Sequence, residues 1–459
     1  MIKRITTREQ LIEALHEAAE LEHDLMCQYL FAAYSMKRSV SEGGVDAVQL
    51  EKIRRWGSLI TSVARQEMEH MGLVLNMLSA IGGTPHFARP NFPQKADYYG
   101  RADIELTLTA FNTDTIRRFQ VFEQPDPPPQ QGWCHRPQGR AAGAVREQVR
   151  AGTLTQANIE AARLDQAEVK FNSVQDLYMK ILEGFVNVTR KVGESKLFTG
   201  SAKEQVWGGP GSAYEGSMDD LNQYDMDFIP VTNLQSASNA IFMILEQGEG
   251  VSALSNYVEH THYCIFTTML AEMEGAGAGG PLEASRPVVS NPMTLIHPHT
   301  RKRGVNLITN PDTREVAGLF NNCYELMLLM LMFLYSNNNK TKEQAASLMN
   351  AIFFPLMTMF IRPLSETLTL LPAFMDKPGN AGPGFELSTD VLLLPPPDYA
   401  WKIFQERLDE LARDFARLNI LKNKQQPPEI VERLKYMGEN MAHLAKDWRK
   451  NWKNVGRSQ

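Results

Sequence analysis

The chain has little cysteine, with only four among its 459 residues and no C-x-x-C pair. Cysteines scattered in this way are expected to pack as small core hydrophobes in a reducing compartment. The sequence therefore predicts free, buried thiols at Cys27, Cys134, Cys264 and Cys323.

The chain also lacks an excess of charge of either sign. Its 47 basic and 53 acidic side chains leave a net charge of −6, and its isoelectric point is near 6.0. No basic excess suggests nucleic acid as a partner, and no acidic tail is visible.

No segment has the length or pattern of a signal peptide or a membrane span. The first residues lack an apolar stretch of the secretory type. The most apolar runs, Leu326–Tyr335 and Ala351–Ile361, are each about ten residues, too short for a bilayer core of about 30 Å. We expect them to form a buried helical hairpin. With 43% hydrophobic and 22% charged residues, the chain can build a sizeable core, and a cytoplasmic enzyme is expected.

What the chain does have is a polar pair where core residues belong. Glu67 and His70 lie three residues apart in a predicted helix, on a seam read at alternating steps of four and three. The other seam members are Trp56, Ile60, Val63, Val74 and Met77. A carboxylate and an imidazole in a dry seam cost several kcal/mol each unless a partner satisfies them. Four-helix bundles use this Glu-x-x-His spacing to bind two iron or manganese ions.

Two further predicted helices repeat this pattern. Glu22 takes an interior position in the first helix, and Glu259 and His262 form another Glu-x-x-His pair. The other seam members are Leu15, Ala18, Leu25, Tyr29 and Ala33 in the first helix, and Ser255, Phe266 and Met269 in the later one. No Lys or Arg lies in these seams as an ion-pair partner. Three of the four contributions to a dinuclear metal site are therefore visible.

The fourth contribution has several candidates. The helix at 166–188 has an apolar seam, but Asp176 and Glu183 share the adjoining face and either could reach inward. Glu246 and Glu249 are the alternative, because the glycines beside Glu249 suggest backbone that leaves the regular helix and turns a carboxylate into the site. The competing readings are a solvated helix face for Asp176 and Glu183, and simple helix termination at Gly248 for the other pair.

The helices are expected to form an all-α four-helix bundle over 1–273, with insertions at 86–165 and 194–234. A helical C-terminal region at 280–459 is expected to pack on this bundle. We expect the 194–234 insertion, rich in Gly and aromatic residues, to cover the entrance of the metal site as a lid. The predicted bundle helices are 7–38, 46–81, 166–189 and 236–271, the last with a break at 248–250, and the C-terminal helices are 312–336, 341–372, 398–418 and 428–453.

Several segments also resemble a known family, the iminophenyl-pyruvate dimer synthases of the violacein and chromopyrrolate type. The segments similar to its ferritin-like domain are Leu21–Leu30, Gln66–Met71, Ser173–Tyr178, Glu246–Gly250 and His262–Tyr263, and those similar to its C-terminal part are Ile361–Leu364 and Ala381–Glu386. The resemblance implies a ferritin-like fold, and its Gln-Gly-Glu-Gly hallmark favours Glu249 as the extra ligand. Those enzymes carry a large region before this domain, whereas this sequence is expected to start directly at the bundle. The resemblance therefore implies metal-dependent oxidation more directly than oxidative imine coupling.

These observations predict a di-iron oxidase or oxygenase that uses dioxygen on a small amino-acid-derived or secondary-metabolite substrate. Carboxylates with imidazoles suit iron, with manganese as the alternative. Tyr178 is a candidate hydrogen-bond partner of a ligand. The competing functions are an iron-handling or peroxide-scavenging protein and a helical scaffold, and a homodimer is the alternative to a monomer. The predicted metal ligands are Glu22, Glu67, His70, Glu183, Glu249, Glu259 and His262.

Overall fold

In the computed structural model, the backbone is described for most of the chain. The described residues are 4–95, 105–125, 134, 173–206, 208, 228–248, 261–276, 282–295, 304–336, 342–389, 392–423 and 425–455.

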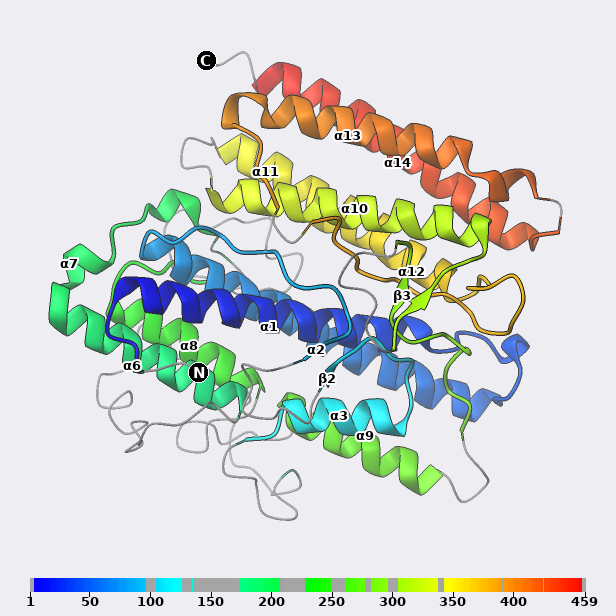
Figure 1. The fold of residues 1–459 in the computed structure, drawn as a ribbon, viewed down its shortest axis with the longest axis horizontal. Coiled ribbons are helices and arrows are strands. Elements are labelled where there is room, and N and C mark those ends of the chain that lie inside the picture. Colours follow the sequence, from blue (N-terminus) through cyan, green and yellow to red (C-terminus); the bar gives the residue numbers. More distant parts are fainter. Residues whose placement is uncertain are drawn as a thin grey trace.

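Two long antiparallel helices, α1 (Arg8–Ser35) and α2 (Ala47–Ala80), run through the centre of the molecule (Figure 1). Both begin where the sequence predicts, at a capping box. The Thr7 side chain accepts the N–H of Gln10, whose own side chain accepts the N–H of Thr7, and Asp46 begins α2 in the same way. The short connection between the helices sets their antiparallel packing.

Two shorter helix pairs face this long pair. α6 (Val174–Val192) packs on α8 (Leu234–Gly248), and α3 (Thr113–Phe122) packs on α9 (His262–Ala276). Figure 1 shows the α6–α8 pair near one end of α1 and the α3–α9 pair near the other. Of the predicted helix at 236–271, the structure describes α8 up to Gly248 and α9 from His262, and most of the predicted break at 248–250 lies outside the described residues. The last turn of α3, the first turns of α6 and α9 and the end of α8 therefore meet near the middle of α1 and α2.

The C-terminal helices form a layer over another face of α1 and α2 (Figure 1). The predicted helix at 341–372 is three consecutive helices, with a π-helix in the middle that contains Pro355. Proline cannot donate the α-helical hydrogen bond and clashes with the preceding turn, so the backbone adopts a wider ladder here. The helices of this layer are α10 (Pro311–Ser336), α11 (Lys342–Ala351), η6 (Ile352–Ile361), α12 (Arg362–Leu368), α13 (Pro397–Arg417) and α14 (Pro428–Val455).

Two segments of this layer are long and apolar enough, by length and composition, to cross a membrane. They are Pro311–Ser336 and Gln344–Leu368, and 67% and 50% of their most apolar windows are buried inside the fold. The runs that the sequence predicts as a buried hairpin fall in these two segments. Burial of this extent is what core helices of a packed layer show.

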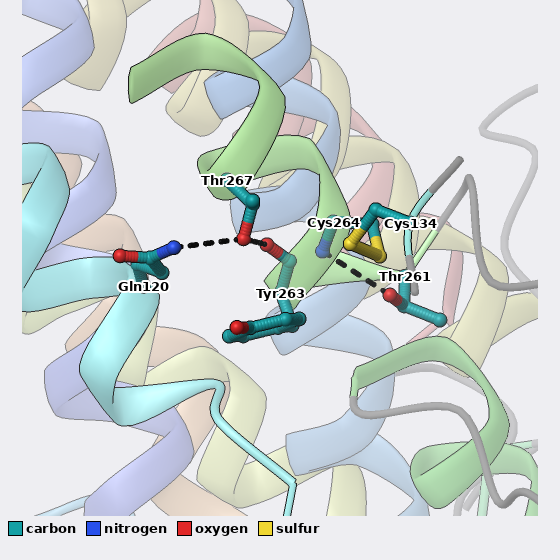
Figure 2. Close-up of a disulfide and its surroundings, with 6 residues drawn as sticks. All are labelled: Gln120, Cys134, Thr261, Tyr263, Cys264 and Thr267. Carbon is teal, nitrogen blue, oxygen red and sulfur yellow. Dashed lines mark hydrogen bonds between the residues drawn. A yellow bond between two sulfur atoms is a disulfide. The ribbon is translucent and has the colours of Figure 1, made fainter. Parts of the chain in front are cut away.

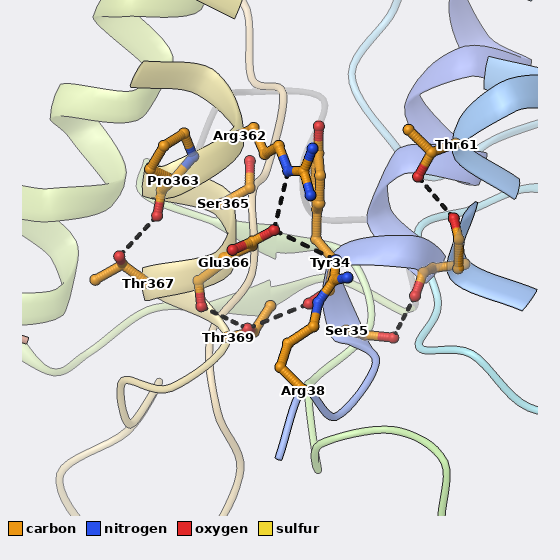
Figure 3. A network of polar contacts seen from close by, with 12 residues as sticks. Tyr34, Ser35, Arg38, Thr61, Arg362, Pro363, Ser365, Glu366, Thr367 and Thr369 are labelled. Carbon is orange, nitrogen blue, oxygen red and sulfur yellow. Dashed lines mark hydrogen bonds and ion pairs between the residues drawn. The ribbon is translucent and has the colours of Figure 1, made fainter. Parts of the chain in front are cut away.

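A polar network fastens this layer to the end of α1 (Figure 3). Glu366 accepts from Arg38 at 3.3 Å and from Arg362 at 3.2 Å. Thr369 donates to the backbone oxygen of Tyr34 at 3.4 Å. These contacts fix the position of α12 against the bundle.

The remaining described elements are short. β1 pairs antiparallel with β2, and β3 pairs parallel with β4. Their bounds are η1 (Val40–Glu42), β1 (Gln94–Lys95), β2 (Glu105–Leu106), α7 (Glu194–Leu197), η3 (Ala202–Glu204), β3 (Pro292–Met293), β4 (Asn306–Leu307) and η7 (Asn419–Lys422).

Candidate metal centre

Five buried side chains meet where the helix ends converge, and Glu67 lies between two imidazoles. Glu67 Oε2 is 2.8 Å from His70 Nδ1, and Glu67 Oε1 is 3.0 Å from His262 Nδ1. A further carboxylate oxygen lies 3.5 Å from each of these nitrogens, from Glu22 beside His70 and from Glu123 beside His262. Two groups of three candidate ligands result, each with its ligand atoms within 4.8 Å of one another, and they share Glu67.

The fold supplies these side chains from four helices. Glu22 comes from α1, Glu67 and His70 from α2, Glu123 follows the last residue of α3, and His262 is the first residue of α9. All of them except His262 border a small cavity of about 250 Å³, its open mouth included. Its remaining walls are apolar or glycine: Leu25, Val174, Ile244, Leu245 and Gly248. The long helices thus provide the rigid half of the cluster, and two helix ends complete it.

Two glutamines hold the far sides of the imidazole rings. His70 Nε2 lies 2.7 Å from Gln247 Oε1, and His262 Nε2 lies 3.0 Å from Gln66 Oε1. The Gln247 amide is oriented by its own donation to Glu69 at 3.1 Å. Because an amide oxygen only accepts, each Nε2 carries a proton and donates it. Each Nδ1 therefore points into the cluster and can exchange its proton for a metal ion.

Two tyrosines hold the carboxylates of Glu22 and Glu123, as the glutamines hold the imidazoles. The Tyr178 hydroxyl donates to Glu22 Oε1 at 2.5 Å, and the Tyr29 hydroxyl donates to Glu123 Oε1. In each carboxylate the other oxygen, Oε2, remains directed at a histidine. The two halves of the cluster are therefore built alike, each with one imidazole, one tyrosine-bound carboxylate and a share of Glu67.

The buried carboxylates and imidazoles of the cluster shift one another's pKa values. Burial, followed by the charge of Glu67, raises the pKa of Glu22 to about 8 and also raises the pKa of Glu123. Burial would raise the pKa of Glu67 too, but the charges of His262 and His70 hold it well below its ordinary value. Burial opposes protonation of His262, yet Glu67 and Glu123 raise its pKa to about 9. The cluster therefore attracts positive charge strongly.

Whether metal ions would fit the cluster can be judged from three of its buried ligand atoms. Glu22 Oε2, Glu67 Oε1 and His262 Nδ1 are buried and make no well-aligned hydrogen bond within the described part of the chain, although Glu67 Oε1 and His262 Nδ1 face each other as an ion pair at 3.0 Å. A buried polar atom without a partner costs roughly 1–3 kcal/mol. All three are good donors for iron or manganese, and divalent ions would satisfy them together. The residues present thus fit a pair of metal ions.

A protein-family model described as Ferritin-like matches residues 15–271, more than half of the chain. The chain belongs to the ferritin-like family. The predicted all-α ferritin-like fold is therefore confirmed, together with the resemblance that pointed to it.

This ferritin-like chain is also similar to two biosynthetic proteins. It is 28% identical over 462 residues to the dichlorochromopyrrolate synthase of Lentzea aerocolonigenes, a match that covers 95% of this chain and 41% of that protein. It is 26% identical over 393 residues to the 2-imino-3-(indol-3-yl)propanoate dimerase of Chromobacterium violaceum, covering 81% of this chain and 33% of that protein. The chain thus spans less than half the length of either relative. A solved ferritin-like protein from Caulobacter vibrioides is 15% identical, with a TM-score of 0.44, and the match covers 76% of this chain and 94% of that one.

Of the predicted ligands, the structure brings together Glu22, Glu67, His70 and His262. It does not bring Glu183 to them. The Glu183 side chain is 52% exposed and pairs with Arg4 at 3.4 Å, because it lies on the solvated face of α6. The prediction of an inward Glu183 was wrong.

The other candidates for the extra ligand lie in different surroundings. Asp176 is buried in the first turn of α6 and contacts Lys180 at 2.9 Å. Glu246 lies in α8 and belongs to neither group of candidate ligands among the described residues. Glu249 and Glu259 both lie outside the described residues.

Sequence reasoning missed Glu123, which completes the second half of the cluster. Its signal was present, because Ile116, Phe119 and Glu123 follow one another at steps of three and four, as a seam with a polar member. The helix has only ten residues and lies in the segment interpreted as an insertion. Glu123 was therefore not considered as a ligand.

A disulfide near His262 corrects the prediction of four free thiols (Figure 2). Cys134 and Cys264 are bonded, with Cα atoms 5.4 Å apart across a sequence separation of 130, whereas Cys27 and Cys323 are free and buried. Nearby, Gln120 of α3 donates to Thr267 of α9 at 2.9 Å. The Gln120–Thr267 hydrogen bond fixes the first turns of α9 against α3, and the disulfide links the same turns to Cys134.

The structure describes only the ends of the predicted lid at 194–234, because 207 and 209–227 lie outside the described residues. Both ends are held by Asn76 of α2, which donates to the backbone oxygens of Val206 at 2.6 Å and Ile229 at 3.0 Å. Phe228 borders a different cavity from the metal cluster. The lid stays a prediction.

Proposed function

We propose that this chain is a non-haem dinuclear-metal oxidase or oxygenase, with iron as the metal and manganese as the alternative. The observation that carries the proposal is the shared carboxylate of Glu67, with one histidine and one further carboxylate on each side. Ferritin-like bundles bind two metal ions with carboxylates and imidazoles that project into the bundle core from facing helices, as these side chains do. Glu22, Glu67 and His70 would hold one ion, and Glu67, Glu123 and His262 the other.

Bound metal ions would supply the reaction with dioxygen and the oxidising power that side chains lack. The protein's own part is to hold geometry and to exclude water. Gln66 and Gln247 hold the imidazole rings, so that both Nδ1 atoms face inward. Tyr29 and Tyr178 fix the outer carboxylates. The apolar residues around the cavity keep the cluster dry, which strengthens every charge interaction within it.

We propose a small amino-acid-derived molecule of secondary metabolism as the substrate. The names of the two relatives support this class, since one is a dimerase of an indole-bearing imino acid and the other makes a dichlorinated chromopyrrolate. Oxidative coupling of two imines is the most specific form of the proposal. Because the chain spans only 41% and 33% of those proteins, their whole activity is carried over only as a proposal.

Oxygen uptake separates this function from simple iron handling. The full chain is loaded with ferrous iron, and oxygen consumption is followed with and without an indole-bearing imino acid. A substrate-dependent oxidase consumes oxygen continuously only when substrate is present, and the Glu67→Ala variant should not. An iron-handling protein would consume oxygen in proportion to the ferrous iron supplied, with no effect of substrate, and that result would overturn the proposal.

A further inference from the structure

The two halves of the metal cluster differ in what holds their backbone in place. Glu22 and His70 lie well inside α1 and α2, so the long helices on either side of them fix their positions. Glu123 instead follows the last residue of α3, and His262 is the first residue of α9. Helix ends make fewer backbone hydrogen bonds than helix interiors and open more easily. The half built on Glu123 and His262 therefore depends on contacts outside its own helices.

The Cys134–Cys264 disulfide is such a contact (Figure 2). Cys264 lies in the same helical turn of α9 as His262, and both cysteines pack against Tyr263 between them. Cys134 follows Glu123 in the sequence, after the end of α3. The bond therefore closes a short covalent path between the two ligands of this half. That path is roughly a tenth as long as the chain of about 140 residues that otherwise joins Glu123 to His262.

Loop closure gives the size of this constraint. The probability that two points of a flexible chain meet falls with about the three-halves power of the length between them. A path ten times shorter raises the effective concentration of one ligand beside the other by roughly thirtyfold. Packing of α3 on α9, with the Gln120–Thr267 hydrogen bond, already supplies part of this effect. We therefore expect the bond itself to contribute about tenfold.

The remaining cysteines offer no second bond of this kind. Cys27 and Cys323 are free and buried, and they are the only other cysteines in the sequence. A mild reductant therefore has one disulfide to act on, and that disulfide adjoins one half of the cluster. Disulfides persist or open according to the redox poise of their surroundings, so this half can respond to it.

We propose that the Cys134–Cys264 bond is a redox modification site that holds His262 and Glu123 together and so sets metal affinity at their half of the cluster. The reagent is a dithiol. One of its thiolates attacks a sulfur of the bond to form a mixed disulfide, and its second thiol then displaces the protein sulfur. The dithiol leaves as its own disulfide, and two electrons and two protons pass to Cys134 and Cys264. The inference rests on the proposed two-ion centre, and the ion held by Glu22 and His70 should not respond.

The test compares metal binding by the full chain with the bond closed and open. Dithiothreitol opens the bond, and gel filtration without oxygen removes the reagent. Because both cysteines are buried, reduction is followed to completion by alkylation in denaturant and mass spectrometry. Manganese(II) titration should then show one site weakened by about tenfold and the other within about twofold of its affinity in the oxidised chain. Equal affinity in both forms, or equal loss at both sites, would overturn the proposal.

Variants show which site responds. Glu123→Ala keeps only the ion at His70, so reduction should leave its remaining affinity within about twofold. The double variant Cys134→Ser/Cys264→Ser should bind manganese like the reduced wild type. Cys323→Ser, which changes a free buried cysteine, is the matched control and should bind like the oxidised wild type. A double variant that binds like the oxidised wild type would contradict the role of the bond.

Hydrogen exchange in metal-free protein separates this inference from the proposed function. After reduction, the backbone amides in the first turns of α9 should exchange at least about tenfold faster, and those around His70 should stay within about twofold. If neither form binds metal, the proposed function fails, and faster exchange in α9 still supports the role of the bond in holding His262. Unchanged exchange in α9 would overturn that role. Loss of the helical circular dichroism on reduction would overturn it too, because a bond that acts on one half leaves the fold intact.

Discussion

The two cavities on α1 and α2 are built from adjacent residues that face different ways. On α2, Glu67 and His70 belong to the metal cluster, whereas Met68 and Met71 line the apolar cavity. The first cavity is small and bordered by four ionisable side chains, and the second, between these helices and the C-terminal layer, is larger and mostly apolar. The difference teaches that one helix can border two unlike cavities through neighbouring side chains, because successive side chains point about 100° apart. A substitution in the wall of one cavity should then leave the other cavity largely unchanged.

The largest effect is expected from Glu67→Ala, which removes the carboxylate shared by both halves of the cluster. Bound metal should fall by more than about tenfold, and activity should be lost. The metal-free protein should lose stability, because removal of Glu67 leaves the buried imidazoles of His70 and His262 without their ion-pair partner. Elemental analysis and urea unfolding measure the two effects. Full metal occupancy in Glu67→Ala, or in a parallel His70→Ala variant, would show that these residues do not bind the metal.

A smaller effect is expected from Glu123→Ala, which changes only one half of the cluster. It should lose the ion held with His262 and retain the one held with His70, so that metal content falls by about half. Glu183→Ala is the matched control, since Glu183 is an exposed glutamate paired with Arg4. Elemental analysis of both variants decides the matter. Equal metal content in the two would contradict the assignment of Glu123.

At the apolar cavity, Leu328→Ala on α10 should show the reverse pattern. Leu328 is 2% exposed and lines the larger cavity. Truncation should lower the free energy of unfolding by about 2–3 kcal/mol, toward the low end for buried leucines because existing space already borders the side chain. Metal content should not change. If Leu328→Ala loses metal as Glu67→Ala does, the two cavities are not independent, and the contrast drawn between them is wrong.

The smallest effect is expected from Tyr178→Phe, which removes the hydroxyl that donates to Glu22. The ring still packs, so the fold should be unchanged. Metal affinity, measured by competition with a coloured chelator, should weaken by about tenfold, as for other hydrogen-bond partners of metal ligands. An unchanged affinity would mean that Tyr178 serves only in packing.

Much of this molecule could be predicted from local pattern. The capping boxes at Thr7 and Asp46 set the starts of the long helices. Glu22, Glu67, His70 and His262 stood out because a polar side chain in an apolar seam needs a partner. These features depend only on residues within a few turns of each other.

What escaped prediction depends on contacts between distant segments. Glu123 reaches the cluster only because α3 packs on α9, and Glu183 is excluded only by its position beside Arg4 at the surface. The Cys134–Cys264 bond joins residues 130 apart in sequence, and no cysteine spacing indicates it.

The most direct test of the central claim is the metal content of the full chain, purified aerobically after supplementation of the culture with iron or manganese. Two ions held around a shared Glu67 predict about two equivalents of iron or manganese per chain. Less than about half an equivalent of any transition metal in well-folded protein would contradict a dinuclear centre.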